Sequence, residues 1–144
     1  MATEFDLIHR PLPSNSNGPT IVGIGVDLIE RSRVDREFSR KQWGTGDSVF
    51  TADELRRYGR GKCRAARLSA CFAAKESALK ALGAEVEDLG LFREVELLFE
   101  PAGRPQMVLH SRLRAKAESL GVRHIWVSIA SAKKHAGAFV VMES

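Results

Sequence analysis

Residues 71–83 hold the side chains of this chain that are best suited to chemistry. Glu76 and Lys80 are four residues apart, so on an α-helix they lie one turn apart and share a face. A carboxylate and an amine on one face can together hold a metal ion and an anionic substrate. The same spacing is also that of an ordinary surface ion pair. Both interpretations stay open for this segment by itself.

A further carboxylate follows an apolar run near the N-terminus. Residues 21–26 are rich in β-branched side chains, which predicts a buried strand that brings Asp27 to its C-terminal end. Gly23 and Gly25 favour close packing of this strand against another element. Asp27 could instead cap the helix that follows. The glycines do not form a dinucleotide-binding motif, because Leu28 stands where the third glycine would be required.

The segment after Asp27 predicts an amphipathic helix over residues 31–41. Val34 and Phe38 are one turn apart and form its apolar side. The exposed side is either an ordinary solvated surface or a docking surface for an acidic partner, whose association complementary charge would accelerate. Its basic residues are Arg31, Arg33, Arg36, Arg40 and Lys41.

The remaining segments predict a mixed α+β domain. Thr51 and Glu54 form a capping box that begins a helix over residues 51–58, and a long helix over residues 64–82 ends at Gly83. The order of elements implies a mostly antiparallel sheet packed against the long helix. The other predicted elements are strands at 95–99 and 106–109 joined as a hairpin, a helix at 111–120, and strands at 124–129 and 136–142.

Together these segments resemble the holo-acyl-carrier-protein synthase family, the small type of phosphopantetheinyl transferase. The resemblance extends from about residue 21 to residue 141 and implies a 4′-phosphopantetheinyl transferase-like fold. It also implies a homotrimer with an active site at each subunit interface. The matching motifs are Gly-x-Asp-Leu-Ile-Glu at 25–30, Phe-Thr at 50–51 with Glu54, Phe-Ala-Ala-Lys-Glu-Ser-Ala-x-Lys-Ala-Leu-Gly at 72–83, Gly-Arg-Pro at 103–105 and Val-Ser-Ile at 127–129.

The chemistry that this resemblance implies is transfer of the 4′-phosphopantetheine arm of coenzyme A to a serine of an apo acyl carrier protein. Asp27 and Glu76 would hold Mg²⁺, which binds to one or two carboxylates and keeps waters and phosphate oxygens as its other ligands. Lys80 would stabilise negative charge on the phosphates. Either Glu76 or a metal-held water polarised by it would accept the serine proton.

The resemblance also assigns residues to the two substrates. Lys62 and Arg64 would hold the 3′-phosphate of coenzyme A, although a solvated basic loop explains them as well. Gly103 and Pro105 would lie near the nucleotide base, although a hairpin turn explains them equally well. The residues assigned to the carrier protein are Arg33, Arg36 and Arg40.

One position departs from the family pattern on the coenzyme A side. Ser131 stands where the family has the histidine of Ser-x-Ser-His, and a serine can donate a hydrogen bond but carries no positive charge. Along a strand, His135 would be more than about 10 Å away unless the chain turns there. Lys133 or Lys134 could supply the missing charge. We therefore expect altered binding of coenzyme A with metal-dependent transfer intact.

Two other kinds of function compete with the transferase. A divergent family member could bind a carrier protein or nucleotide without transfer. A nucleic-acid-binding protein is the other, but the net charge of +4, from 22 basic and 18 acidic residues, does not select nucleic acid over an acidic protein. The chain has neither an aromatic RNA-binding motif nor zinc-ligand spacing, so we expect no nucleic-acid partner.

The length of 144 residues predicts one compact domain at residues 20–144. Residues 1–19 read as a flexible N-terminal extension, with the boundary at Gly18-Pro19, and they lack the hydrophobic region of a signal peptide. No run of 18 apolar residues occurs, so we expect no membrane span. The two cysteines are those of an ordinary cytoplasmic protein.

Overall fold

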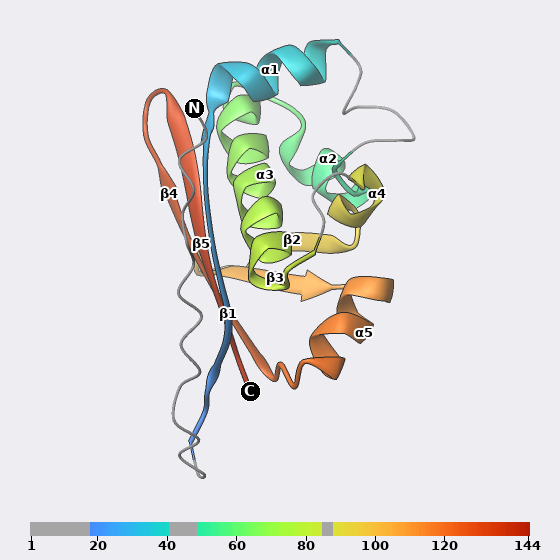
Figure 1. The fold of residues 1–144 in the computed structure, drawn as a ribbon. Helices are drawn as coiled ribbons and strands as arrows, with labels where there is room; N and C mark the ends of the chain where they lie inside the picture. Colours follow the sequence, from blue (N-terminus) through green and yellow to red (C-terminus); the bar gives the residue numbers. More distant parts are fainter. Residues whose placement is uncertain (1–17, 41–48, 85–87) are drawn as a thin grey trace, which may run out of the picture.

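The computed structural model describes residues 18–40, 49–84 and 88–144. Their strands form two antiparallel sheets, one with three strands and one with two. Figure 1 shows the described helices on one side of the larger sheet. The larger sheet has the order β1 (Ile21–Glu30), β5 (His135–Glu143), β4 (His124–Ser131), and the smaller one pairs β2 (Val95–Phe99) with β3 (Pro105–Leu109). This confirms the predicted α+β class with antiparallel sheets.

The long helix α3 (Arg64–Ala81) packs directly against β1 and β5. Gly23 and Gly25 make this approach possible, since a Cβ atom built on Gly25 would lie only 1.7 Å from the carbonyl oxygen of Ser77. The Ser77 hydroxyl donates to the carbonyl oxygen of Ala138 at 3.0 Å, which ties the helix to the central strand. The prediction that the two glycines serve close packing is therefore confirmed.

The prediction that β1 is a buried strand with Asp27 at its end is wrong. The strand continues to Glu30, so Asp27 lies inside it, and one of its two faces is exposed. Its glycines point toward α3, which leaves Val26 and Leu28 on the other face with 62% and 72% of their surface exposed. Alternating side chains on an edge strand explain both observations. Asp27 also does not cap a helix, because the N-cap of the next helix is Glu30.

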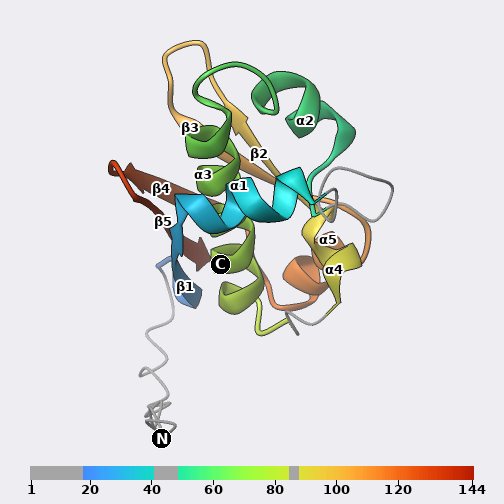
Figure 2. The same cartoon turned by 90° about the horizontal axis from the view of Figure 1, so that it is seen from above.

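Three further helices lie near the N-terminal end and the middle of α3, as Figure 1 and Figure 2 show. The predicted capping box is present: Glu54 donates its backbone N–H to Thr51 Oγ1, and its carboxylate accepts from the Thr51 N–H at 2.9 Å. The shortest of these helices was not predicted. Asp88 caps it by accepting from the Gly90 N–H at 2.9 Å. The helices are α1 (Arg31–Ser39), α2 (Ala52–Tyr58) and α4 (Leu89–Phe92).

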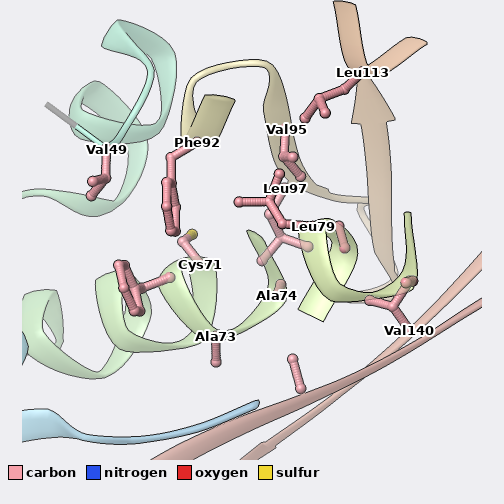
Figure 3. Packing of buried hydrophobic residues seen from close by; sticks show 14 of the residues in the cluster. Val49, Cys71, Ala73, Ala74, Leu79, Phe92, Val95, Leu97, Leu113 and Val140 are labelled. Atoms are coloured by element: carbon pink, nitrogen blue, oxygen red, sulfur yellow. The ribbon is translucent and has the colours of Figure 1, made fainter. Parts of the chain in front are cut away.

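The main hydrophobic core lies between α3 and the elements on its two sides. Figure 3 shows Cys71, Phe92 and Leu97 converging on one side of α3, while Ala73 points toward the larger sheet. The remaining helix, α5 (Ser111–Ser119), contributes Leu113 to this core. Small side chains along α3 let the helix lie close to its neighbours, so most of its residues are buried.

A charged pair lies inside this core. Lys75 Nζ lies 2.7 Å from Glu54 Oε2, and both side chains are fully buried. Lys75 also donates to the carbonyl oxygens of Phe92, at 2.8 Å, and Val95. Glu54 accepts in addition from the Leu97 N–H at 3.0 Å. The pair therefore joins α3 to α2, α4 and β2 with its polar atoms satisfied.

Candidate functional site

The structure brings together the three residues that the sequence singles out for catalysis. Lys80 Nζ lies 3.0 Å from Asp27 Oδ1 and 3.5 Å from Glu76 Oε1. It also donates to the carbonyl oxygen of Val26 at 3.2 Å. The cluster has one carboxylate from the strand β1 and one from the helix α3, because the glycines of β1 hold the two elements close together.

Burial and the neighbouring carboxylates have opposite effects on the pKa of the Lys80 ammonium. Desolvation is the largest influence on Lys80 and lowers its pKa, but the hydrogen bond and charge of Asp27 and the charge of Glu76 together outweigh it. The pKa of Lys80 is therefore raised above its ordinary value. The side chain of Asp27 is only 11% exposed and that of Glu76 21%, so both carboxylates lie in partly desolvated surroundings.

This donor set suits a hard divalent cation that keeps part of its hydration shell. Asp27 and Glu76 both lie within ion-pair distance of one nitrogen, so their oxygens already converge on one cation. Mg²⁺ is commonly held by one or two carboxylates together with waters and phosphate oxygens. The described residues contain no cluster of three or more His, Cys, Asp and Glu side chains that could hold a metal ion. A cage made only of protein ligands is therefore not found in this part of the chain.

Gly103 and Pro105, which are assigned to coenzyme A, do not lie beside this cluster within one chain. Pro105 lines a pocket of about 580 Å³ together with Trp126 and Val127 of β4. Asp27 lies on β1, at the opposite edge of the three-stranded sheet, with β5 between. Gly103 occupies the turn of the β2–β3 hairpin with a φ of 84°, a left-handed conformation that favours glycine.

Arg64 is the first residue of α3, about 18 Å along the helix axis from Glu76, and Lys62 lies just before the N-cap Cys63. Lys62 is exposed. Arg64 donates to Asp35 Oδ1 at 2.7 Å and stacks over the ring of Phe38 at 5.0 Å, so it also joins α3 to α1. Arg64 therefore has a structural role that the sequence did not predict, and its role toward coenzyme A stays a prediction.

The chain does turn between Ser131 and His135. Ser131 pairs with Ala136 in the β4–β5 hairpin, and the Ala132 N–H donates to the carbonyl oxygen of His135 at 2.8 Å. His135 is thus close to Ser131 along the hairpin, but alternation along β5 directs it to the other sheet face. The side chain of Arg31 donates to the carbonyl oxygen of Ala132 at 2.7 Å, a contact that holds the turn and that the sequence did not predict.

The three arginines assigned to the carrier protein lie on one side of α1. At 3.6 residues per turn, Arg33, Arg36 and Arg40 fall within an arc of about 60°. All three are exposed. Val34 is buried and Phe38 packs against the core, as predicted, so the basic side of the helix faces solvent. Lys41 lies outside the described residues.

No helix among the described residues is both long and apolar enough to cross a membrane.

The outer face of the three-stranded sheet is apolar and exposed. The two-stranded sheet lies beside β4 on the helix side and does not cover this face. The large apolar side chains exposed on it are Ile24, Val26, Leu28, Trp126 and Phe139. A face of this kind marks an interaction surface.

Known proteins provide an independent comparison. A holo-[acyl-carrier-protein] synthase from Alkalilimnicola ehrlichii is 39% identical over 129 residues, which cover 86% of this chain and 98% of that protein. Another from Photobacterium profundum is 33% identical over 124 residues, with 86% and 98% covered.

Solved structures are similar over the same region. The holo-[acyl-carrier-protein] synthase from Neisseria meningitidis has a TM-score of 0.76 at 26% identity, with 87% of this chain and 100% of that one covered. The enzyme from Bacillus anthracis, in complex with CoA (3′,5′-ADP), has a TM-score of 0.69 at 26% identity, with 86% and 97% covered. Residues 23–140 match the family described as the 4′-phosphopantetheinyl transferase superfamily, and the chain belongs to it.

Proposed function

We propose that the protein transfers the 4′-phosphopantetheine arm of coenzyme A to a serine hydroxyl of an apo acyl carrier protein. The products are the holo carrier protein and adenosine 3′,5′-bisphosphate. The observation that carries this proposal is the cluster of Asp27, Glu76 and Lys80 in a chain of this superfamily. The relatives that cover most of the chain are named holo-[acyl-carrier-protein] synthases, which supports the same reaction.

The cluster suits a reaction in which positioning and charge neutralisation dominate. The serine oxygen would form a bond to the phosphorus next to pantetheine, and the bond to the bridging oxygen would break. Asp27 and Glu76 would hold Mg²⁺, which supplies positive charge to the phosphate oxygens when bound. Lys80 would orient the phosphates and stabilise the negative charge that develops on them. Glu76, directly or through a water, would accept the serine proton.

Coenzyme A would reach this cluster from a neighbouring subunit. Asp27 lies on β1, at one edge of the three-stranded sheet, whereas Pro105 lies on β3 of the two-stranded sheet, beside β4 at the other edge. A site that uses both residues would therefore be completed between subunits. The exposed apolar face of the sheet offers the contact surface for a homotrimer. In this arrangement Lys62, Arg64, Gly103, Pro105 and Ser131 would bind the nucleotide part of coenzyme A.

The basic side of α1 is the proposed docking surface for the carrier protein. Arg33, Arg36 and Arg40 present positive charge next to the strand that holds Asp27. An acidic carrier would be attracted to this side, which would raise its association rate most strongly at low salt. The pathway of the carrier and a cytoplasmic location stay predictions.

Intact-protein mass spectrometry tests the transfer directly. The chain is incubated with an apo acyl carrier protein, coenzyme A and Mg²⁺, and we expect the carrier to gain the mass of one phosphopantetheine. Asp27→Asn should abolish the gain, whereas Asp53→Asn should not, because Asp53 pairs with Arg56 on the surface. A chelator should stop transfer and added Mg²⁺ should restore it. No gain with any of several carriers would contradict the proposal.

The second candidate function is a divergent member that binds carrier or nucleotide without transfer. Ser131 in place of a cationic histidine favours it, because the serine brings no charge to the phosphates. Calorimetric titration with coenzyme A separates the two functions. Binding of coenzyme A without any mass gain of the carrier would support the second candidate, and Ser131→His is then the first change to test for restored transfer.

A further inference from the structure

The ammonium of Lys80 has the surroundings that a bound cation would have. Three oxygen atoms surround Nζ, from the carboxylates of Asp27 and Glu76 and the carbonyl of Val26, at 3.0, 3.5 and 3.2 Å. Two of the three belong to the carboxylates assigned to the divalent ion. The carboxylate of Asp27 is nearly buried, so it has little access to other counterions from solvent.

We propose that Lys80 is an internal counterion that competes with the divalent cation for the oxygens of Asp27 and Glu76. Nζ occupies one oxygen of each carboxylate, and a divalent ion held by the same two groups would lie close enough to the ammonium for strong repulsion in this partly desolvated site. The divalent ion therefore binds only as the ammonium moves away. This inference rests on the proposed function for the identity of the metal site and adds to Lys80 a role that precedes the chemistry.

The shape of the lysine side chain permits this exchange. Lys80 lies one turn after Glu76 on α3, and 42% of its side chain is exposed, so its flexible stem can swing outward without disturbing the core. Its new position would lie beside the same cluster, where the phosphates of coenzyme A would be bound. One lysine would thus neutralise the carboxylates at one stage and the phosphates at the next.

Binding of Mn²⁺ as a paramagnetic probe, followed by electron paramagnetic resonance, tests the competition without carrier or coenzyme A. We expect Lys80→Met to bind Mn²⁺ about tenfold more tightly than the wild type. Lys116→Met is the matched control, because Lys116 donates to the carbonyl oxygen of Gly83 beyond the end of α3 and touches no carboxylate of the cluster. This control should leave the affinity unchanged.

The gain in affinity must also depend on the proposed metal site. It should disappear in the double variant Asp27→Asn/Lys80→Met, which removes one of the two carboxylates. Suppose that Asp27→Asn weakens Mn²⁺ binding by the wild type, but Lys80→Met binds Mn²⁺ no more tightly than the wild type. This result would overturn the competition and leave the proposed metal site intact. Absence of Asp27-dependent binding in every variant would overturn both, whereas loss of transfer alone would affect only the proposed function.

Discussion

Lys75 and Glu76 are neighbours in the sequence, but the structure gives them opposite surroundings. Lys75 is fully buried against Glu54, while Glu76 faces the edge of β1 beside Asp27 and Lys80. A rotation of about 100° per residue on α3 is enough to separate the two roles. Burial is the largest influence on Lys75 and lowers its pKa, and Glu54 opposes this effect. A lysine of a buried ion pair and a carboxylate of the candidate site are therefore consecutive residues of α3.

Removal of one member of the buried pair should destabilise the protein strongly. We expect Lys75→Met to lower the free energy of unfolding by about 3–5 kcal/mol, because the Glu54 carboxylate loses its counterion inside the core. Urea denaturation followed by circular dichroism measures the change. Lys62→Met, at an exposed position, is the control and should have little effect. Glu54→Gln/Lys75→Met should recover much of the loss, and a mild effect of Lys75→Met would contradict the argument.

Lys80 should make stability depend on alkaline pH. Its pKa is raised in the folded protein above the ordinary value of 10.5, so its ammonium stabilises the fold fully below that value. The contribution is lost as the pH rises through the higher pKa of the folded state. We expect Lys80→Met to be less stable than the wild type at pH 8 and the difference to shrink as the pH rises above 10.5. A difference that stays constant over this range would argue against the ion pairs.

At the scale of elements, the contact between β1 and α3 sets the geometry of the site. Gly23 and Gly25 let the strand approach the helix backbone, and this approach brings Asp27 to Glu76 and Lys80. The β4–β5 hairpin meets the start of α1 in a similar way, because the Arg31 N–H donates to the carbonyl oxygen of Lys134 at 2.8 Å. The site therefore depends on backbone packing between elements more than on any loop.

A methyl group at Gly25 should separate the strand from the helix. We expect Gly25→Ala to cost about 3 kcal/mol or more of unfolding free energy, because its Cβ would meet the backbone of α3 at Ser77, which cannot move aside as a side chain could. Thermal unfolding measures this cost. Gly18→Ala is the matched control, since nothing lies within 4 Å of its added Cβ. Unchanged stability of Gly25→Ala would show that β1 can shift freely.

At the scale of the whole molecule, the two sides of the larger sheet differ in what covers them. Described helices cover one side, whereas Val26, Leu28 and Phe139 leave the other side apolar and exposed. Pro105, proposed for coenzyme A, lies beside β4 at one edge of that sheet, whereas Asp27, proposed for the metal, lies on β1 at the other edge. Both features are accounted for if the sheets of several subunits pack together and complete each site.

A charge on the outer sheet face should break such an assembly. We expect Leu28→Asp to shift the protein from trimer to monomer in size-exclusion chromatography with light scattering, because a carboxylate would be buried at the interface. Transfer activity should fall with it and rise again at high protein concentration. Leu120→Asp is the control, as Leu120 is an exposed apolar residue at the end of α5. A wild-type protein that is already monomeric would contradict the trimer.

The sequence by itself determined most helices and strands from spacing, and its resemblance to a known family singled out the three residues of the cluster. The capping box of α2 and the termini of α3 depend on local backbone geometry, so local patterns predict them. The pairing of Glu54 with Lys75 was missed, although Lys75 lies on the apolar stripe that contains Phe72 and Leu79. A lysine at such a position indicates a buried partner, but its spacing does not name the partner.

Tertiary structure alone decided which of the assigned residues meet. Asp27 and Lys80 are 53 residues apart in sequence and bonded in space, because two glycines permit close packing. Pro105 lies on β3 of the two-stranded sheet, beside β4 and away from β1, and no local pattern encodes this packing of one sheet against the other. The exposed face of β1 was predicted as buried, because an apolar run has the same composition whether its own chain or another subunit covers it.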